Sequence, residues 1–130
     1  MMTRMFALIQ APWLQLVGFL AGFIVISLAT LTPMEQLPAV PGSDKLHHVI
    51  GFGGWAFMCA FGPFKRFLYL SVFIFLWGGA IELIQPSVNR YGEWLDFYAD
   101  ALGVCLIVIL RATLFYRAKI RQLSESQDKN

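Results

Sequence analysis

The sequence predicts an all-α integral membrane protein, a four-transmembrane-helix bundle with both termini in the cytoplasm. Three observations predict this fold: the composition, four long apolar segments and the distribution of basic residues. Hydrophobic residues make up 58% of the chain and charged residues 14%, and the mean hydropathy is +0.63. Soluble domains carry about 25% charged residues, so this composition excludes an ordinary soluble domain.

Four apolar segments are each near the ~20 residues that a helix needs to cross about 30 Å of hydrocarbon. We expect helices at about 13–31, 46–62, 67–85 and 96–116. The prolines that follow the first residues of the chain fall between these segments or at their ends, where helices stop. These are Pro33, Pro38, Pro41, Pro63 and Pro86. Residues 1–116 then form one domain, and 117–130 form a basic, partly disordered cytoplasmic tail, which we expect to begin as a short interfacial helix and to fray into a polar end.

The first apolar segment also has features of a secretory signal peptide. Arg4 precedes it, and small residues near Ala29 resemble a cleavage site. Its apolar run of about 19 residues exceeds the usual h-region of about 7–15 residues. We therefore interpret it as a retained helix.

The basic residues predict the orientation. With the amino terminus in the cytoplasm, only Lys45 and Arg90 of the ten basic residues lie on the outer side. This asymmetry follows the positive-inside rule, and it directs the loops 32–45 and 86–95 outward. The cytoplasmic set is Arg4, Lys65, Arg66, Arg111, Arg117, Lys119, Arg121 and Lys129.

The same topology brings most of the ionisable residues near the helix ends to the outer side. At 1.5 Å per residue, His48, Glu82 and Asp100 each lie about 6 Å inside the ends of their helices. A charge placed in hydrocarbon costs at least ~2.5–3.5 kcal/mol, so intramembrane charges indicate a functional site. We therefore expect one polar, outward-facing site near the outer interface.

Helical spacing orients these side chains. Asp44 and His48 are four residues apart on one face, as are Asp96 and Asp100, whereas His47 diverges from His48 by about 100°. We expect His47 to face lipid headgroups or a neighbouring helix, and Glu93 to be a solvated loop charge. Glu82 should contact a basic or hydrogen-bonding group from the second or fourth helix. The proline-bearing loop around Glu35 is a candidate lid over this cavity.

A combination of motifs resembles the VanZ-like family of bacterial membrane proteins, which is named for a teicoplanin-resistance protein. The motifs are Asp44-Lys45-x-x-His48, Glu82-x-x-Gln85, Arg90 and Asp96, with a helix continuing to Gly103. The resemblance covers about residues 28–110. It implies a multi-pass protein of the bacterial inner (cytoplasmic) membrane, linked to antibiotic resistance. Asp100 departs from the family, which usually has Asn at this position.

Four interpretations of the cluster remain open. In the first, it is an enzyme site in which His48 or Glu82 is the general base and basic residues hold an anionic envelope precursor. In the second, it binds such a precursor or a glycopeptide-type ligand without catalysis. Candidate catalytic residues are His48, Glu82 and Asp96, and candidate ligand-binding residues are Asp44, Lys45, Gln85, Arg90 and Asp100.

The third interpretation is a metal site. His48, Glu82, Asp96 and Asp100 offer donors that suit zinc or manganese, but no familiar ligand spacing is present, so no residue is assigned to a metal and no cofactor is identified. The fourth is a network that only locks the helices together. The lipid bilayer is the expected partner, a homo-oligomer is left open, and the dispersed basic residues do not favour nucleic-acid binding.

Overall fold

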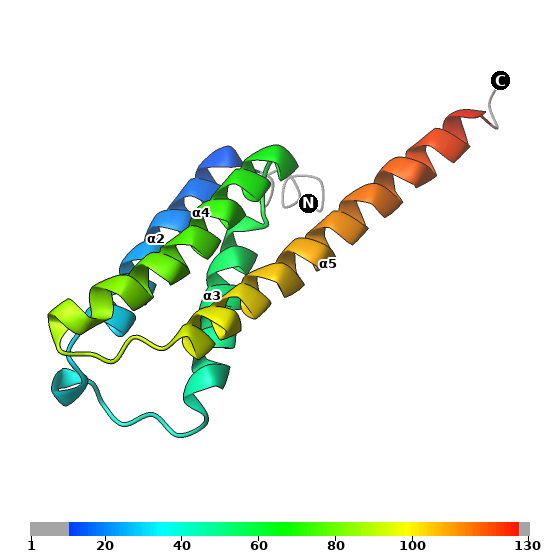
Figure 1. Cartoon of the computed structure of the whole chain (residues 1–130). Coiled ribbons are helices and arrows are strands. Elements are labelled where there is room, and N and C mark those ends of the chain that lie inside the picture. The colour runs from blue at the N-terminus through cyan, green and yellow to red at the C-terminus, as the bar shows by residue number, and fades with distance from the viewer. Residues whose placement is uncertain (1–10, 128–130) are drawn as a thin grey trace.

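The computed structural model describes residues 11–127 as an all-helical protein, in agreement with the sequence prediction (Figure 1). The α-helices are α2 (Pro12–Leu31), α3 (Asp44–Cys59), α4 (Phe64–Ile84) and α5 (Trp94–Gln127). Two short 3-10 helices, η1 (Met34–Gln36) and η2 (Gln85–Val88), lie in the loops. Three segments of the described chain are long and apolar enough to cross a membrane: α2, α4 together with η2, and α5.

Helix α3 is shorter than its predicted counterpart. It ends at Cys59 because Gly62, with φ of 107°, and Pro63 form the turn into α4. Its 16 residues span about 24 Å at 1.5 Å per residue, which is less than the ~30 Å of a bilayer core. If α3 crosses a membrane, the longer helices packed against it must cover the part of the bilayer thickness that α3 does not span.

Helix α5 is longer than predicted. It continues without a break through 117–127, which the sequence analysis assigned to a partly disordered tail. After Gly103 the helix contains no glycine or proline, and Ala, Leu, Arg, Lys, Gln and Glu, all good helix formers, are frequent in its last turns. Its 34 residues span about 51 Å. Arg4 and Lys129, which contribute to the predicted orientation, lie outside the described residues.

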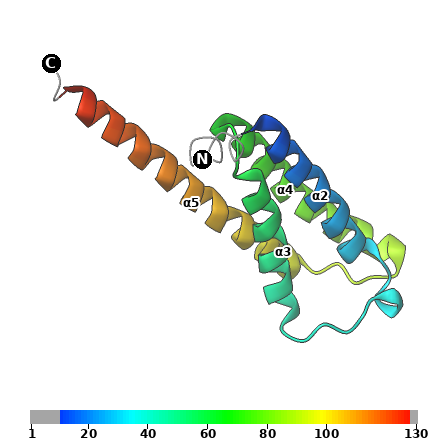
Figure 2. The same cartoon turned by 180° about the vertical axis from the view of Figure 1, so that it is seen from behind.

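Helix α3 packs most extensively against α5 and also against α2 and α4, and α4 contacts α5 as well (Figures 1 and 2). The loops 32–43 and 89–93 lie together at one end of the bundle, and the turn 60–63 lies at the opposite end. The part of α5 after residue 116 is exposed and projects away from the other helices. We call the first end the loop end and the second the turn end.

Two glycines bring α3 and α5 into backbone contact. A Cβ on Gly103 would collide with the carbonyl oxygen of Val49 and would lie 2.8 Å from the nitrogen of Gly53. Small residues permit this close approach between helices in a membrane. The contact holds the first turns of α3 and α5 together, and those turns carry the ionisable residues of the loop end.

Aromatic side chains fill the space between α2, α3 and α4. Trp55 is 1% exposed, packs against Phe19 and Phe23, and donates its indole N–H to the carbonyl of Phe19 at 2.9 Å. Gly22 makes room for the indole ring, since any Cβ there would overlap it. This core fixes α2 against α3 and so positions the end of α2 beside the start of α3.

Two polar side chains stabilise the turn end. Gln15 donates to the carbonyl oxygens of Cys59 at 2.9 Å and Pro63 at 3.3 Å. Arg111 donates to the carbonyl oxygens of Ala60 at 2.9 Å and Gly62 at 3.5 Å. The last carbonyls of a helix lack partners within it, so these bonds satisfy the end of α3 and the turn that follows.

Candidate functional site

A buried histidine–aspartate pair lies at the centre of the loop end. His48 Nδ1 of α3 is 2.8 Å from Asp100 Oδ1 of α5, and the two residues are 8% and 1% exposed. Gly78 of α4 provides the space for this carboxylate, because a Cβ there would lie 3.2 Å from Asp100 Oδ2. The pair therefore depends on three helices. A carboxylate on one ring nitrogen fixes the orientation of a histidine.

Asp96 lies next to this pair and joins it to Lys45. The Lys45 ammonium donates to Asp96 Oδ1 and, at 2.8 Å, to Glu93 Oε2. The other oxygen, Asp96 Oδ2, lies 3.6 Å from His48 Nε2.

Glu82 joins the cluster through the backbone of the loop before α5. Its side chain is 4% exposed, and Oε2 accepts the backbone N–H of Glu93 at 2.6 Å. Gly92 allows this approach, because a Cβ there would collide with the carbonyl oxygen of Glu82. The expected partner from the second or fourth helix is thus replaced by a main-chain donor one residue before α5. Sequence spacing gives no information on this loop path.

Gln85 and Arg90 lie away from the histidine and bind the end of α2 instead. Gln85 donates to the carbonyl oxygen of Thr30 at 3.1 Å. Arg90 donates through Nη1 to the carbonyl oxygens of Thr32 at 3.1 Å and Ala29 at 3.4 Å. These carbonyls have no partner within the helix, so the side chains of Gln85 and Arg90 satisfy the end of α2. The carboxylates, His48 and Lys45 remain together.

The charge in this cluster is unbalanced. Its carboxylates belong to Asp44, Glu82, Glu93, Asp96 and Asp100, whereas Lys45 is the lysine or arginine that the structure places among them. Two carboxylate oxygens, Glu82 Oε1 and Asp100 Oδ2, are buried without a hydrogen-bond partner among the described residues. Buried polar atoms without partners are rare in native proteins and indicate a functional group or an unfilled site.

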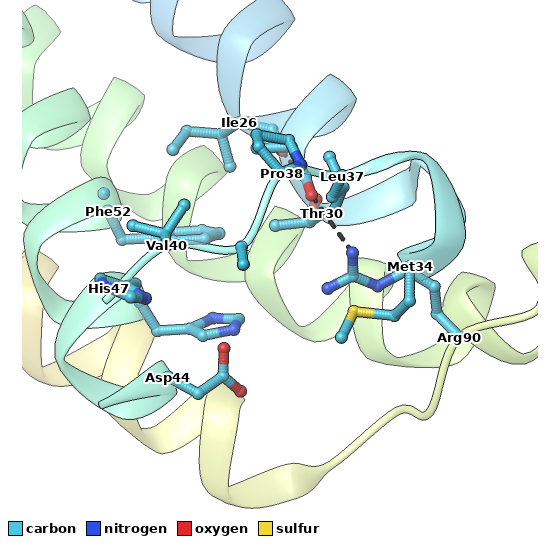
Figure 3. A pocket seen from close by; sticks show the side chains of 14 residues that line it. Ile26, Thr30, Met34, Leu37, Pro38, Val40, Asp44, His47, Phe52 and Arg90 are labelled. Atoms are coloured by element: carbon cyan, nitrogen blue, oxygen red, sulfur yellow. Dashed lines mark hydrogen bonds between the residues drawn. The ribbon is translucent and has the colours of Figure 1, made fainter. Parts of the chain in front are cut away.

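A pocket borders the cluster on the side of α2 (Figure 3). It has a volume of about 780 Å³ and lies between the end of α2, the loop 32–43 and the first half of α3. Arg90 and Asp44 reach it from opposite sides, with Met34 beside Arg90. The lining residues are Ile26, Ala29, Thr30, Met34, Leu37, Pro38, Ala39, Val40, Asp44, His47, His48, Gly51, Phe52 and Arg90. Most of this lining is apolar, as in typical small-molecule sites.

Two residues of this region make contacts that the sequence interpretation did not include. His47, expected to face headgroups or another helix, lines the pocket, and its Nε2 donates to the carbonyl oxygen of Pro41 at 3.0 Å. The Glu93 side chain is 55% exposed, as expected of a solvated loop charge, and it also bonds Lys45 while its backbone bonds Glu82. In both cases the path of a loop decides the contact. The loop around Glu35 does contribute Met34, Leu37 and Pro38 to the pocket wall.

Comparisons with protein-family models, with curated proteins and with solved structures find no match to this chain.

Proposed function

We propose that this chain is a multi-pass protein of the bacterial inner membrane that binds an amphipathic envelope molecule carrying an anionic group. The observation that carries the proposal is the pocket of about 780 Å³ at the loop end. The walls of the pocket are mainly apolar, and the Arg90 guanidinium lies at one side. His48, which lines the pocket, bonds the buried carboxylate of Asp100. Such a pocket suits a ligand with an apolar portion and a charged headgroup.

We infer that all four helices cross the membrane, with both termini cytoplasmic and the loop end facing outward. The excess of basic residues at the turn end and in α5 supports this orientation. Helix α3 is short, but it packs against α2, α4 and α5, which limits its contact with lipid. Its first turn then lies within the outer part of the bilayer. An amphipathic ligand could enter from the outer leaflet.

Arg90 supports an anionic ligand group. A guanidinium has five N–H donors, and the carbonyl oxygens of Ala29 and Thr32 accept hydrogen bonds from Nη1 of Arg90 alone. The remaining donors are suited to a phosphate or carboxylate. The VanZ-like motifs support an envelope precursor or a glycopeptide-type molecule as the ligand, and a role in sensitivity to glycopeptide antibiotics such as teicoplanin.

A catalytic form of this function assigns the general base to His48. Asp100 orients the ring through Nδ1 at 2.8 Å, and His48 is one of the residues that line the pocket. This arrangement of base and orienting carboxylate is common in proton transfer. Asp96 and Glu82 supply further carboxylates beside it.

A second candidate function, a non-catalytic helix lock, is favoured by a different observation. Lys45, Gln85 and Arg90 all bond within the protein, and each bond joins two separate segments. Such bonds between helices in bilayers contribute only about 0.6 kcal/mol each on average. The lock alone would not require the two buried, unpartnered carboxylate oxygens.

The ligand proposal is tested by filling the pocket. Ala39 is exposed, lines the pocket and belongs to no helix, so Ala39→Trp should occupy the space without disturbing helix packing. Binding of lysophosphatidic acid and lysophosphatidylcholine to the full chain in nanodiscs is measured by native mass spectrometry. We expect tighter binding of the anionic lipid, loss of binding in Ala39→Trp and weaker binding in Arg90→Gln.

The matched control is Ala118→Trp, which adds the same ring at an exposed position of the projecting part of α5. It should bind both lipids as the wild type does. Equal binding of the two lipids, or unchanged binding in Ala39→Trp, would contradict the proposal. In cells, the loss of function in folded Ala39→Trp should change sensitivity to glycopeptide antibiotics, whereas Ala118→Trp should not.

A further inference from the structure

The two ring nitrogens of His48 have different surroundings. Nδ1 lies 2.8 Å from Asp100 Oδ1, a normal hydrogen bond. Nε2 lies 3.6 Å from Asp96 Oδ2, which is too long for a hydrogen bond. The side chain is 8% exposed, so this nitrogen is aimed at a carboxylate from a buried position. When His48 is neutral with its proton on Nδ1, Nε2 presents a lone pair to a carboxylate oxygen, and a second ring proton or a cation between the two atoms removes the repulsion.

Asp44 completes a group of three donors around this gap. It lies one helical turn before His48 on α3, and Asp96 lies in the first turn of α5. One ligand atom from each of Asp44, His48 and Asp96 lies within 4.8 Å of the others. Zinc bonds to nitrogen and oxygen are about 2.0–2.2 Å, so donors around a tetrahedral zinc are about 3.4 Å apart. The observed 3.6 Å between His48 and Asp96 is close to that separation.

The neighbours of these donors resemble the outer shell of a metal site. Metal-bound histidines generally donate their other ring N–H to a carboxylate, which is the position of Asp100 relative to His48. Lys45 binds Asp96 Oδ1 and leaves Oδ2 for another partner. Asp100 Oδ2 and Glu82 Oε1 are buried without partners among the described residues. Two additional positive charges would compensate the excess of carboxylates.

We propose that Asp44, His48 and Asp96 bind one divalent transition-metal cation, of the zinc or manganese class, with Asp100 as the residue that positions His48. Imidazole and carboxylate donors together suit these cations. The sequence-based donor set included Glu82, but the structure engages Glu82 with the Glu93 backbone and supplies Asp44 instead.

Three protein ligands leave a coordination position open, as in catalytic rather than structural zinc sites. Asp44 and His48 also line the pocket, so the site borders the space assigned to the ligand. The cation site goes beyond the proposed function and does not require it, because none of its donors depends on an occupant of the pocket.

The test uses the full chain in detergent, stripped with a chelator and titrated with Zn²⁺ alone or Mn²⁺ alone. We expect one equivalent of bound metal by calorimetry and elemental analysis. His48→Ala and Asp96→Asn should each weaken binding at least 100-fold. Asp100→Asn should weaken it about 10–100-fold with the donors intact, as outer-shell substitutions do. The control Glu125→Gln, which removes an exposed carboxylate on α5 outside the donor set and outside the pocket, should leave the affinity unchanged.

Thermal unfolding provides a second measurement. A cation that binds only the folded protein should raise the melting temperature with increasing metal concentration in the wild type. If His48→Ala fails to fold, His48→Gln serves in its place. Absence of stoichiometric binding to folded wild-type protein, or equal affinity in wild type and Asp96→Asn, would overturn the proposal. Ala39→Trp should keep its metal, which separates failure of this site from failure of the ligand proposal.

Discussion

The two ends of the bundle use buried polar side chains in different ways. At the turn end, Gln15 and Arg111 donate to four backbone carbonyls around 59–63. The neutral amide oxygen of Gln15 is buried there without a partner among the described residues. At the loop end, His48, Asp96 and Asp100 face one another, and the buried oxygens without partners include those of carboxylates. The donors at the turn end have a structural role, because the carbonyls at a helix end need hydrogen-bond partners. The loop end has more hydrogen-bond acceptors than donors. A structural role does not account for this excess, which therefore indicates a function.

The loop end also satisfies helix carbonyls, but with a different set of residues. Gln85 and Arg90 bond the end of α2 and resemble the residues of the turn end in this respect. The comparison thus divides the ionisable residues of the loop end into two groups. One group fastens α2, and the other surrounds His48.

The largest expected effect is on the contact that assembles the loop end. Gly103→Ala places a Cβ against backbone atoms of α3 that cannot rotate away, so we expect a cost of about 3 kcal/mol or more, at the top of the range for overpacking. We expect a lower melting temperature and a separation of the His48 and Asp96 turns. Unfolding of purified protein in detergent measures this effect.

The control is Gly54→Ala on α3, where an added Cβ meets nothing within 4 Å. It should leave stability unchanged or raise it, because alanine favours helix over glycine by about 0.8–1 kcal/mol. Equal destabilisation by both variants would show that the close contact at Gly103 does not contribute specifically to the stability of the fold.

An intermediate effect is expected at the turn end. Arg111→Leu removes two donors from the carbonyls of Ala60 and Gly62. Hydrogen bonds from charged groups contribute about 1.5–3 kcal/mol, so stability should fall by roughly this amount. Arg117→Leu, on the exposed part of α5, should change it by less than about 0.5 kcal/mol. Binding of Zn²⁺ at the loop end should survive in folded Arg111→Leu, and a parallel loss would mean that the two ends are coupled.

The smallest effect on stability is expected for Glu82→Gln. The amide oxygen can still accept the Glu93 N–H, while a buried, unpartnered charge is removed. Replacing a poorly compensated buried charge is often neutral or stabilising, so we expect a change within about 0.5 kcal/mol or a gain. Antibiotic sensitivity or ligand binding should nevertheless change. The exposed Glu125→Gln is the control, and clear unfolding of Glu82→Gln would favour the helix lock.

The structure confirms the all-helical part of the predicted fold class and three helices able to span a membrane, because the signal for long apolar helices is local in the sequence. Helices at 13–31 and 67–85 closely match α2 and α4, since length and apolarity determine them. The ends of α3 and α5 were less predictable. The turn at Gly62 shortens α3, and the helical continuation of α5 past 116 depends on propensity rather than on hydrophobicity.

The sequence also determines which residues are exceptional in this chain: the spacing of Asp44 with His48 and of Asp96 with Asp100 places each pair on one helix face. The tertiary structure decides how they combine. The glycine contact of Gly53 with Gly103 aligns the two faces, and the loops bring Glu93 to Lys45 and Arg90 to α2. The physical reason is that helical periodicity depends on residues close together in the sequence. The path of a loop and the distance between two helices depend on contacts between residues that are far apart in the sequence.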